Sequence, residues 1–141
     1  MSVNYFIDTN IFIYSFDERQ PAKKARSLAL IQAGLSSGTG MISTQVVQEF
    51  LNVATRKFAV PMKPEDCLIY LRMVLNPLCQ VYPDLPLYEA CLDVQAESHY
   101  SFYDSLIIAA AMRGGCEILY SEDFQAGQEI RGVKIVNPYS D

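Results

Sequence analysis

Short apolar runs alternate along the chain with longer stretches in which apolar residues recur every three or four positions. The short runs are rich in residues that favour strands. The longer stretches have the helical period and are bounded by residues that cap or break helices. The pattern predicts strands at 3–7, 41–42, 79–82, 118–120 and 133–136, and helices at 11–16, 21–33, 44–58, 64–75, 87–97 and 102–112.

This alternation predicts an α/β domain with a central, mostly parallel sheet of about five short strands and helices on both faces. A length of 141 residues fits a single domain over 1–141. Half of the residues are hydrophobic and only 19% are charged, so the chain can bury a core without disulfides. In such sheets the carboxyl ends of strands and the amino ends of helices share one edge, where ligands usually bind.

Composition limits the metal ligands that the chain can offer and indicates its cellular compartment. No apolar run approaches the roughly 20 residues of a membrane-spanning helix, and the first residues lack the basic region of a secretory signal, so we expect a cytoplasmic protein. The four cysteines are widely spaced without a C-x-x-C pair, which favours free thiols over a zinc site. His99 is the only histidine, so a histidine-rich metal centre is excluded.

Four acidic residues from distant parts of the chain are expected on this one edge. Asp8 directly follows the first strand, and Asp123 follows the strand at 118–120 by three positions. Glu49 lies early in the helix at 44–58, and helical side chains lean back toward the amino end. Asp104 lies in the first turn of the helix at 102–112. The directions of strands and helices therefore predict a cluster of carboxylates.

Each acid also has a simpler explanation. Asp8 could cap a turn, and Asp104 could be favoured only by the amino end of its helix. Asp123 could cap a short turn, and Glu122 could be the ligand in its place. Glu49 borders the apolar face of its helix, where an unpaired carboxylate would be costly, so a purely structural role explains it less well.

Neighbouring carboxylates raise one another's pKa, so a cluster of ionised carboxylates is stable only with a cation among them. Oxygen ligands without histidine or cysteine favour Mg²⁺ or Mn²⁺ over zinc. Such ions favour phosphate as an outer ligand and support phosphodiester hydrolysis through an activated water. The net charge of −5 opposes nucleic-acid binding, but two bound divalent cations would bring it to about −1.

Four segments carry a resemblance to a known family. In order and spacing, the sequence resembles the acidic motifs of PIN domains at Phe6-Ile7-Asp8-Thr9-Asn10, Gln48-Glu49-Phe50, Tyr103-Asp104-Ser105-Leu106-Ile107 and Ser121-Glu122-Asp123-Phe124. Together they span nearly the whole chain. A stand-alone PIN domain of this length looks like a VapC-type toxin of a bacterial toxin-antitoxin pair.

The resemblance implies a Mg²⁺- or Mn²⁺-dependent endoribonuclease that acts on RNA, is often a homodimer and is inhibited by a cognate antitoxin protein. By position, the metal-binding catalytic acids would be Asp8, Glu49, Asp104 and Asp123. The family's supporting polar positions match Asn10 and Ser121. Threonine is frequent in the family where Ser121 stands, and the serine keeps the hydroxyl. Glu122 beside Asp123 makes the fourth ligand the least defined of the set.

Residues outside the cluster offer candidate RNA contacts. Lys23, Lys24 and Arg26 lie close together on one helix, and the pair 56–57 ends another, so either group could bind flanking phosphates. An ordinary solvated helix face is the favoured explanation of each group. Tyr100 and Tyr103 are candidates for stacking on bases, although aromatic residues in such patterns more often belong to the core.

Two other functions remain as alternatives. A phospho-accepting receiver module also gathers acids around Mg²⁺ at the carboxyl edge of a parallel sheet. It requires an acceptor aspartate after the middle strand and a lysine after a later one, and no lysine follows Tyr120 closely. A non-catalytic PIN-like module that binds RNA or protein is the other alternative, and the four intact acids argue against it.

Overall fold

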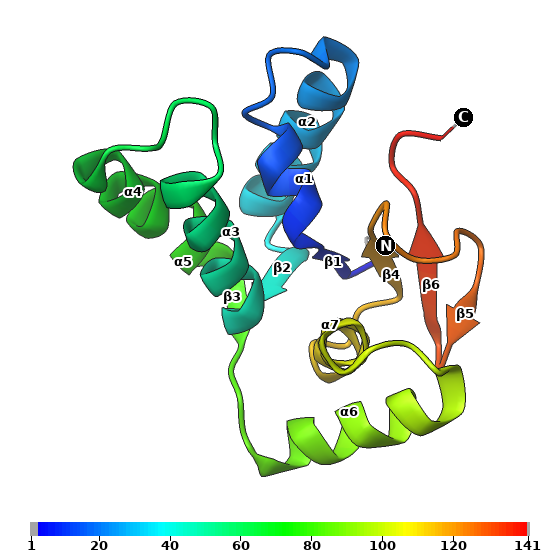
Figure 1. The fold of residues 1–141 in the computed structure, drawn as a ribbon. Coiled ribbons are helices and arrows are strands. Elements are labelled where there is room, and N and C mark those ends of the chain that lie inside the picture. Colours follow the sequence, from blue (N-terminus) through cyan, green and yellow to red (C-terminus); the bar gives the residue numbers. More distant parts are fainter. Residues whose placement is uncertain (1–2, 141) are drawn as a thin grey trace.

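A computed structural model describes residues 3–140, which form a six-stranded sheet with the strand order β3-β2-β1-β4-β6-β5 (Figure 1). All neighbouring strands are parallel except β5 and β6, which pair antiparallel. The predicted α/β class with a mostly parallel sheet is therefore confirmed. The strands are β1 (Tyr5–Ile7), β2 (Gly40–Ser43), β3 (Cys79–Val81), β4 (Ile118–Tyr120), β5 (Glu129–Ile130) and β6 (Val133–Val136).

Helices connect the strands from β1 to β4, as the apolar periodicity predicts, whereas β4, β5 and β6 are joined by loops. Most bounds agree with the sequence pattern within a few residues. The helices are α1 (Thr9–Tyr14), α2 (Pro21–Ser37), α3 (Thr44–Arg56), α4 (Pro64–Tyr70), the π-helical turn η1 (Leu71–Leu75), α5 (Asn76–Leu78), α6 (Leu85–Ser98) and α7 (Phe102–Arg113). None of the helices within residues 3–140 is long and apolar enough to cross a membrane.

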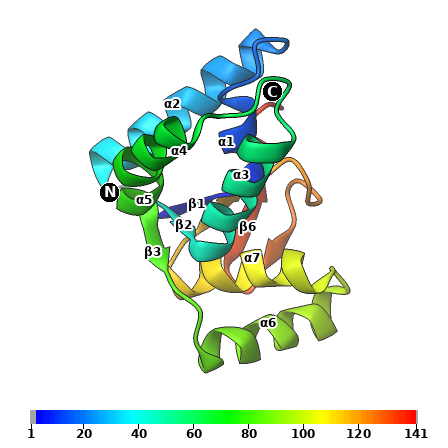
Figure 2. The same cartoon turned by 60° about the vertical axis from the view of Figure 1, so that its left-hand side comes forward.

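Helices cover both faces of the sheet. Helix α7 packs on one face against β2, β4 and β6, and α6 runs along the outer side of α7 (Figure 2). Helices α2 and α5 pack against β2, and α3 packs against α1, β2 and β3. The core between these layers is apolar and includes the fully buried side chains of Phe6, Phe12, Phe50, Ile108 and Leu119. Burial of these side chains is the main force that stabilises the layered fold.

Three details differ from the sequence-based expectations. Strand β5 was not predicted, because a two-residue strand leaves almost no periodic signal. Helix α2 continues past Gly34 to a left-handed C-cap at Gly38. Gly34 has another role: a Cβ on Gly40 of β2 would lie only 2.6 Å from the Cα of Gly34, so the two glycines let helix and strand approach closely.

The helical segment that begins at Pro64 also extends beyond the predicted range of 64–75, to Leu78. The amide of Asn76 bonds to the carbonyl of Leu71, five residues earlier, in a widened π-helical turn. This turn immediately precedes Pro77, and the helix continues through the proline as α5.

The chain changes direction across the sheet at β1. After β1 it builds β2 and β3 on one side, and then returns through α6 and α7 to place β4 on the other side of β1. Such a switch point opens a crevice beyond the carboxyl ends of the two strands that flank it. Residues that follow β1 and β4 therefore meet at the position where α/β sheets bind ligands.

Candidate functional site

Asp8 lies at this switch point and is held from two sides. It follows β1 and is the N-cap of α1, where its Oδ1 accepts the Thr9 amide at 2.7 Å. Its Oδ2 accepts a 2.7 Å hydrogen bond from the Ser121 hydroxyl, which follows β4. Only 6% of Asp8 is exposed. Burial raises the pKa of Asp8 to about 7, against the lowering effect of the two hydrogen bonds, and the charges of Asp123 and Glu49 raise it further.

Glu49 is fixed by hydrogen bonds to both of its carboxylate oxygens. The Thr9 hydroxyl donates to Oε1 at 2.6 Å, and the Gln45 side chain, one helical turn earlier on α3, donates to Oε2 at 3.2 Å. The same Gln45 nitrogen donates to the backbone carbonyl of Tyr103 at 3.1 Å. Thr9 and Gln45 therefore join Glu49 to α1 and to the start of α7.

Gln45 and Thr9 were not singled out from the sequence. The four-residue spacing of Gln45 and Glu49 on one helix is the signal that could have identified the first. The bond from Thr9 to Glu49 depends on the packing of α1 against α3, which no local pattern reports.

Asp104 lies in the first turn of α7, as expected. The N-cap Ser101 accepts the Asp104 amide through its hydroxyl at 3.1 Å, which fixes the backbone of this turn. The side chain is only partly buried. Its charge reaches the loop after β4, because Asp104 is one of the groups that raise the pKa of Asp123.

Asp123 completes the group from the loop that follows β4. Its amide donates to the Ser121 hydroxyl at 3.1 Å, so Ser121 is in contact with both Asp8 and Asp123. Partial burial raises the pKa of Asp123, and the charges of Asp104, Glu122 and Glu49 add to the rise. These mutual effects indicate that the four predicted acids share one electrostatic environment.

The side-chain amide of Asn10 lies among these acids and lacks a well-formed hydrogen bond to the residues that the structure describes. Its amide is near enough to Asp123 to oppose the rise of that carboxyl's pKa. Yet both its Oδ1 and its Nδ2 are buried, and neither completes a hydrogen bond of good geometry with any residue in 3–140. A buried amide in this state normally costs free energy, and an additional ligand beside it would satisfy the amide.

The donors of this site fit a hard divalent cation. Carboxylate oxygens with an unsatisfied amide oxygen nearby are the ligands that Mg²⁺ and Mn²⁺ prefer. Within the part of the chain that the structure describes, no group of three or more His, Cys, Asp or Glu side chains has the arrangement of a complete metal site. Repulsion among the carboxylates opposes a tighter arrangement when no cation balances them.

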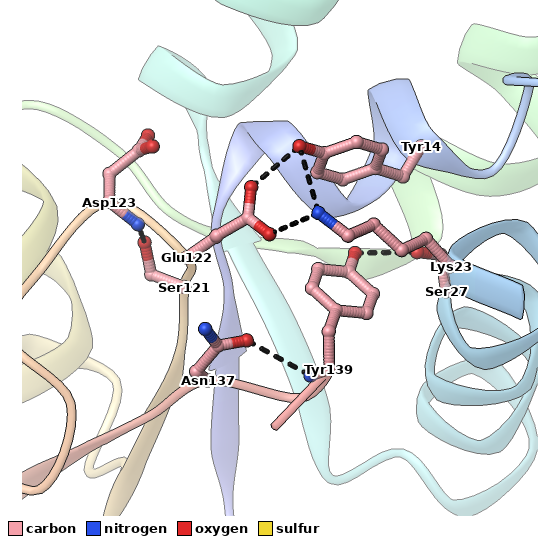
Figure 3. A network of polar contacts seen from close by, with 8 residues as sticks. All are labelled: Tyr14, Lys23, Ser27, Ser121, Glu122, Asp123, Asn137 and Tyr139. Atoms are coloured by element: carbon pink, nitrogen blue, oxygen red, sulfur yellow. Dashed lines mark hydrogen bonds and ion pairs between the residues drawn. The ribbon is translucent and has the colours of Figure 1, made fainter. Parts of the chain in front are cut away.

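Glu122 is turned away from this group (Figure 3). Its carboxylate accepts the Lys23 ammonium and the Tyr14 hydroxyl, each at 2.5 Å. Partial burial alone would raise the pKa of Glu122, but the bonds from Lys23 and Tyr14 hold it below its usual value. The alternative in which Glu122 takes the place of Asp123 is therefore not supported by the geometry.

The basic residues of α2 make contacts within the molecule, which agrees with the favoured explanation of this group as an ordinary helix face. Lys23 is paired with Glu122, Lys24 is paired with Glu18, and the Arg26 Nε donates to the carbonyl of Pro138. Residues 56–57, at the end of α3, are exposed and make no ion pair with any residue that the structure describes. Of the two basic groups, the one at 56–57 makes fewer contacts within the described residues and is the better candidate for RNA contact.

The two tyrosine candidates also differ. Tyr100 is partly buried against Phe124, and its hydroxyl is 2.6 Å from Gln128, so it holds the loop between β4 and β5 and is a poor platform for a base. Tyr103 is 64% exposed and immediately precedes Asp104. It is the aromatic side chain of this pair that is available beside the acids.

Comparison with known proteins gives one family. Residues 5–128 match the PIN domain family. The matched range includes all four acids together with Asn10 and Ser121. No curated protein matches the sequence significantly.

Several solved structures share the fold at low identity. A toxin-antitoxin complex from Klebsiella pneumoniae has a TM-score of 0.68 and 20% identity, covering 98% of this chain and 100% of its own. DNA-bound VapBC from Salmonella typhimurium has a TM-score of 0.66 and 19% identity, covering 95% and 97%. VapC20 from Mycobacterium tuberculosis, a sarcin-ricin loop cleaving toxin, has a TM-score of 0.58 and 20% identity, covering 85% and 90%. At these identities the likeness establishes the fold.

Proposed function

Because this chain belongs to the PIN-domain family, we propose that it is a Mg²⁺- or Mn²⁺-dependent endoribonuclease that hydrolyses RNA phosphodiester bonds. The observation that carries the proposal is the meeting of the four acid-bearing segments at the switch point of the sheet, where Thr9, Gln45 and Ser121 join them by hydrogen bonds. Burial raises the pKa of Asp8 to about 7, so its ionised form is unfavourable unless a positive charge lies beside it. A bound cation would supply that charge.

In this proposal Asp8, Glu49, Asp104 and Asp123 hold the divalent ions. A cation bound there supplies an activated water and offsets negative charge on the leaving oxygen. The chain's own groups orient the ligands: Ser121 fixes Asp8, and Thr9 fixes Glu49. With both oxygens of Glu49 held by donors, this carboxylate keeps one orientation toward the site.

We further propose that the protein is the toxin of a toxin-antitoxin pair. The support is the likeness in fold to the Klebsiella pneumoniae and Salmonella typhimurium toxin-antitoxin structures, both of which align with nearly the whole chain. A cognate antitoxin protein, an RNA substrate, a homodimeric assembly and a cytoplasmic location belong to this proposal.

The test is cleavage of a structured RNA with single-stranded loops in Mg²⁺, in Mn²⁺ and in EDTA. Loss of a ligand that supports the activated water should reduce the rate by about 100-fold or more in Asp8→Asn and in Asp104→Asn. Asp93→Asn, an exposed carboxylate on α6, is the matched control and should cleave at the wild-type rate. Undiminished cleavage in EDTA, or in both active-site variants, would exclude the proposed mechanism.

A further inference from the structure

The loop that carries Asp123 has a second attachment, on the side opposite the acids. Residues 121–128 form bends and turns between β4 and β5, with no regular hydrogen-bond ladder of their own. The Ser121 hydroxyl donates to Asp8 and accepts the Asp123 amide. Glu122, between Ser121 and Asp123, faces helices α1 and α2 (Figure 3). The loop is therefore attached at alternate residues to two different sides of the molecule.

The Glu122 attachment is built from several elements. Tyr14 at the end of α1 and Lys23 near the start of α2 both donate to the Glu122 carboxylate, Tyr14 to one oxygen and Lys23 to the other. The Lys23 and Glu122 side chains are 29% and 27% exposed, so solvent and salt screen this pair less than a surface ion pair. Its geometry restrains both the position and the rotation of the carboxylate.

Aromatic packing supports the same attachment. The Lys23 ammonium lies 4.5 Å from the centre of the Tyr14 ring and 5.2 Å from that of the Tyr139 ring. The Tyr139 hydroxyl is 2.6 Å from the Ser27 hydroxyl, and the Tyr139 amide donates to the Asn137 side chain (Figure 3). The Lys23 ammonium that binds Glu122 therefore also contacts aromatic rings from α1 and from the segment after β6.

We propose that Glu122 is a positioning residue, which through Tyr14 and Lys23 sets the place at which the loop presents Asp123 to the cation. This inference rests on the proposed function. The other end of the loop is secured separately, because Phe124 packs on Tyr100 and the Gly127 amide bonds to the carbonyl of Ile135. Because these contacts remain, removal of the Glu122 attachment should leave the domain folded. The loop should then no longer hold Asp123 in one position.

The experiment measures Mn²⁺ affinity by isothermal titration calorimetry on chelator-treated protein. Glu122→Gln and Lys23→Met should each weaken Mn²⁺ binding about 10-fold, the lower end of the loss typical of residues that orient metal ligands. Tyr14→Phe, which changes no charge, should weaken it by a smaller factor. Because the three groups act as a unit, the double variant Glu122→Gln/Lys23→Met should lose little more than either single variant.

The direction in which Mn²⁺ affinity changes distinguishes a positioning role from a purely electrostatic one. If Glu122 and Lys23 acted only through their electric field, removal of the lysine would tighten cation binding while removal of the glutamate would weaken it. Lys24→Met removes the same charge one position along α2, where the lysine pairs with Glu18, and is the matched control. Thermal unfolding and hydrogen exchange over 121–127 complete the set, with faster exchange expected only when the Glu122 attachment is broken.

The outcomes distinguish this inference from the proposed function. Tighter Mn²⁺ binding in Lys23→Met, or unchanged binding in both Lys23→Met and Glu122→Gln while the wild type binds Mn²⁺ and cleaves RNA, would overturn the positioning role alone. A wild-type protein that neither binds Mn²⁺ nor cleaves RNA would overturn the proposed function and this inference with it.

Discussion

Asp8 and Asp104 have the same side chain and share one electrostatic environment, yet their surroundings differ. Asp8 is buried at the carboxyl end of a central strand and accepts hydrogen bonds from Thr9 and Ser121. Asp104 lies on the first turn of α7, partly exposed, beside the exposed ring of Tyr103. In the metal-free state, ionisation of Asp8 therefore costs folding free energy, whereas Asp104 remains in contact with solvent.

This difference suits the two sides to different tasks in the proposed site. The Asp8 side, formed by the ends of β1 and β4, is buried and hydrogen-bonded, so it suits the tight placement of a cation. The Asp104 side is open and has an aromatic face available, so it suits contact with a substrate. Three measurements can test this division, beginning with the one for which the expected effect is largest.

The first measurement is the pH dependence of stability in EDTA. The unfolded pKa of an aspartate is near 3.8 and burial raises that of Asp8 to about 7, so the folded state holds the proton more tightly over this interval. The stability contributed by protonated Asp8 is fully present below pH 3.8 and is lost as pH rises toward 7. The loss amounts to roughly 4 kcal/mol at most.

Asp8→Asn should remove this loss, so that at pH 8 the metal-free variant unfolds at a higher temperature than the wild type. Urea unfolding at a series of pH values measures this effect. Parallel curves for the wild type and Asp8→Asn would show that Asp8 is not the buried titrating group.

The second measurement is stabilisation by Mn²⁺ at pH 8. A cation present at about 100 times its dissociation constant should stabilise the wild type by roughly 3 kcal/mol, which corresponds to several degrees in Tm. Asp8→Asn should lose nearly all of this shift. Asp104→Asn should keep part of it, because Asp8 and its hydrogen bonds remain in place. An equal shift in all three proteins would place the cation elsewhere.

The third measurement concerns the open side of the site. Tyr103→Ala should raise the KM for a single-stranded RNA about 5- to 10-fold with little change in kcat, as expected for loss of stacking on one base. Thermal stability should change little, because the ring is mostly exposed. Tyr82→Ala, a similarly exposed tyrosine after the edge strand β3, is the control. A pure kcat effect would instead assign Tyr103 to the catalytic arrangement.

Much of the fold could be predicted because its signals are local. Each strand except β5 is a short apolar run, and each helix carries its own periodicity. The end of α2 could not be predicted, because Gly34 serves contact with Gly40 of β2 and not helix termination. Ser43 has the right residue type and position for a cap, yet its buried hydroxyl makes no hydrogen bond to the residues that the structure describes.

The site was predictable to a similar extent and for the same reason. The directions of strands and helices are enough to place Asp8, Glu49, Asp104 and Asp123 on one edge. The groups that orient them are not predictable in this way, since the bonds of Thr9 to Glu49 and of Ser121 to Asp8 join segments 40 and 113 residues apart. The pairing of Lys23 with Glu122 could not be predicted either, because the two residues are 99 positions apart in sequence.

The return of the chain through α6 and α7 to place β4 beside β1 has a consequence for synthesis. Asp8 precedes the serine that orients it by 113 residues, so translation supplies the two sides of the site at different times. A nascent chain therefore carries no assembled acid cluster until β4 has been translated and has paired with β1. The order in which the sheet is wound thus makes the acid cluster a late product of folding.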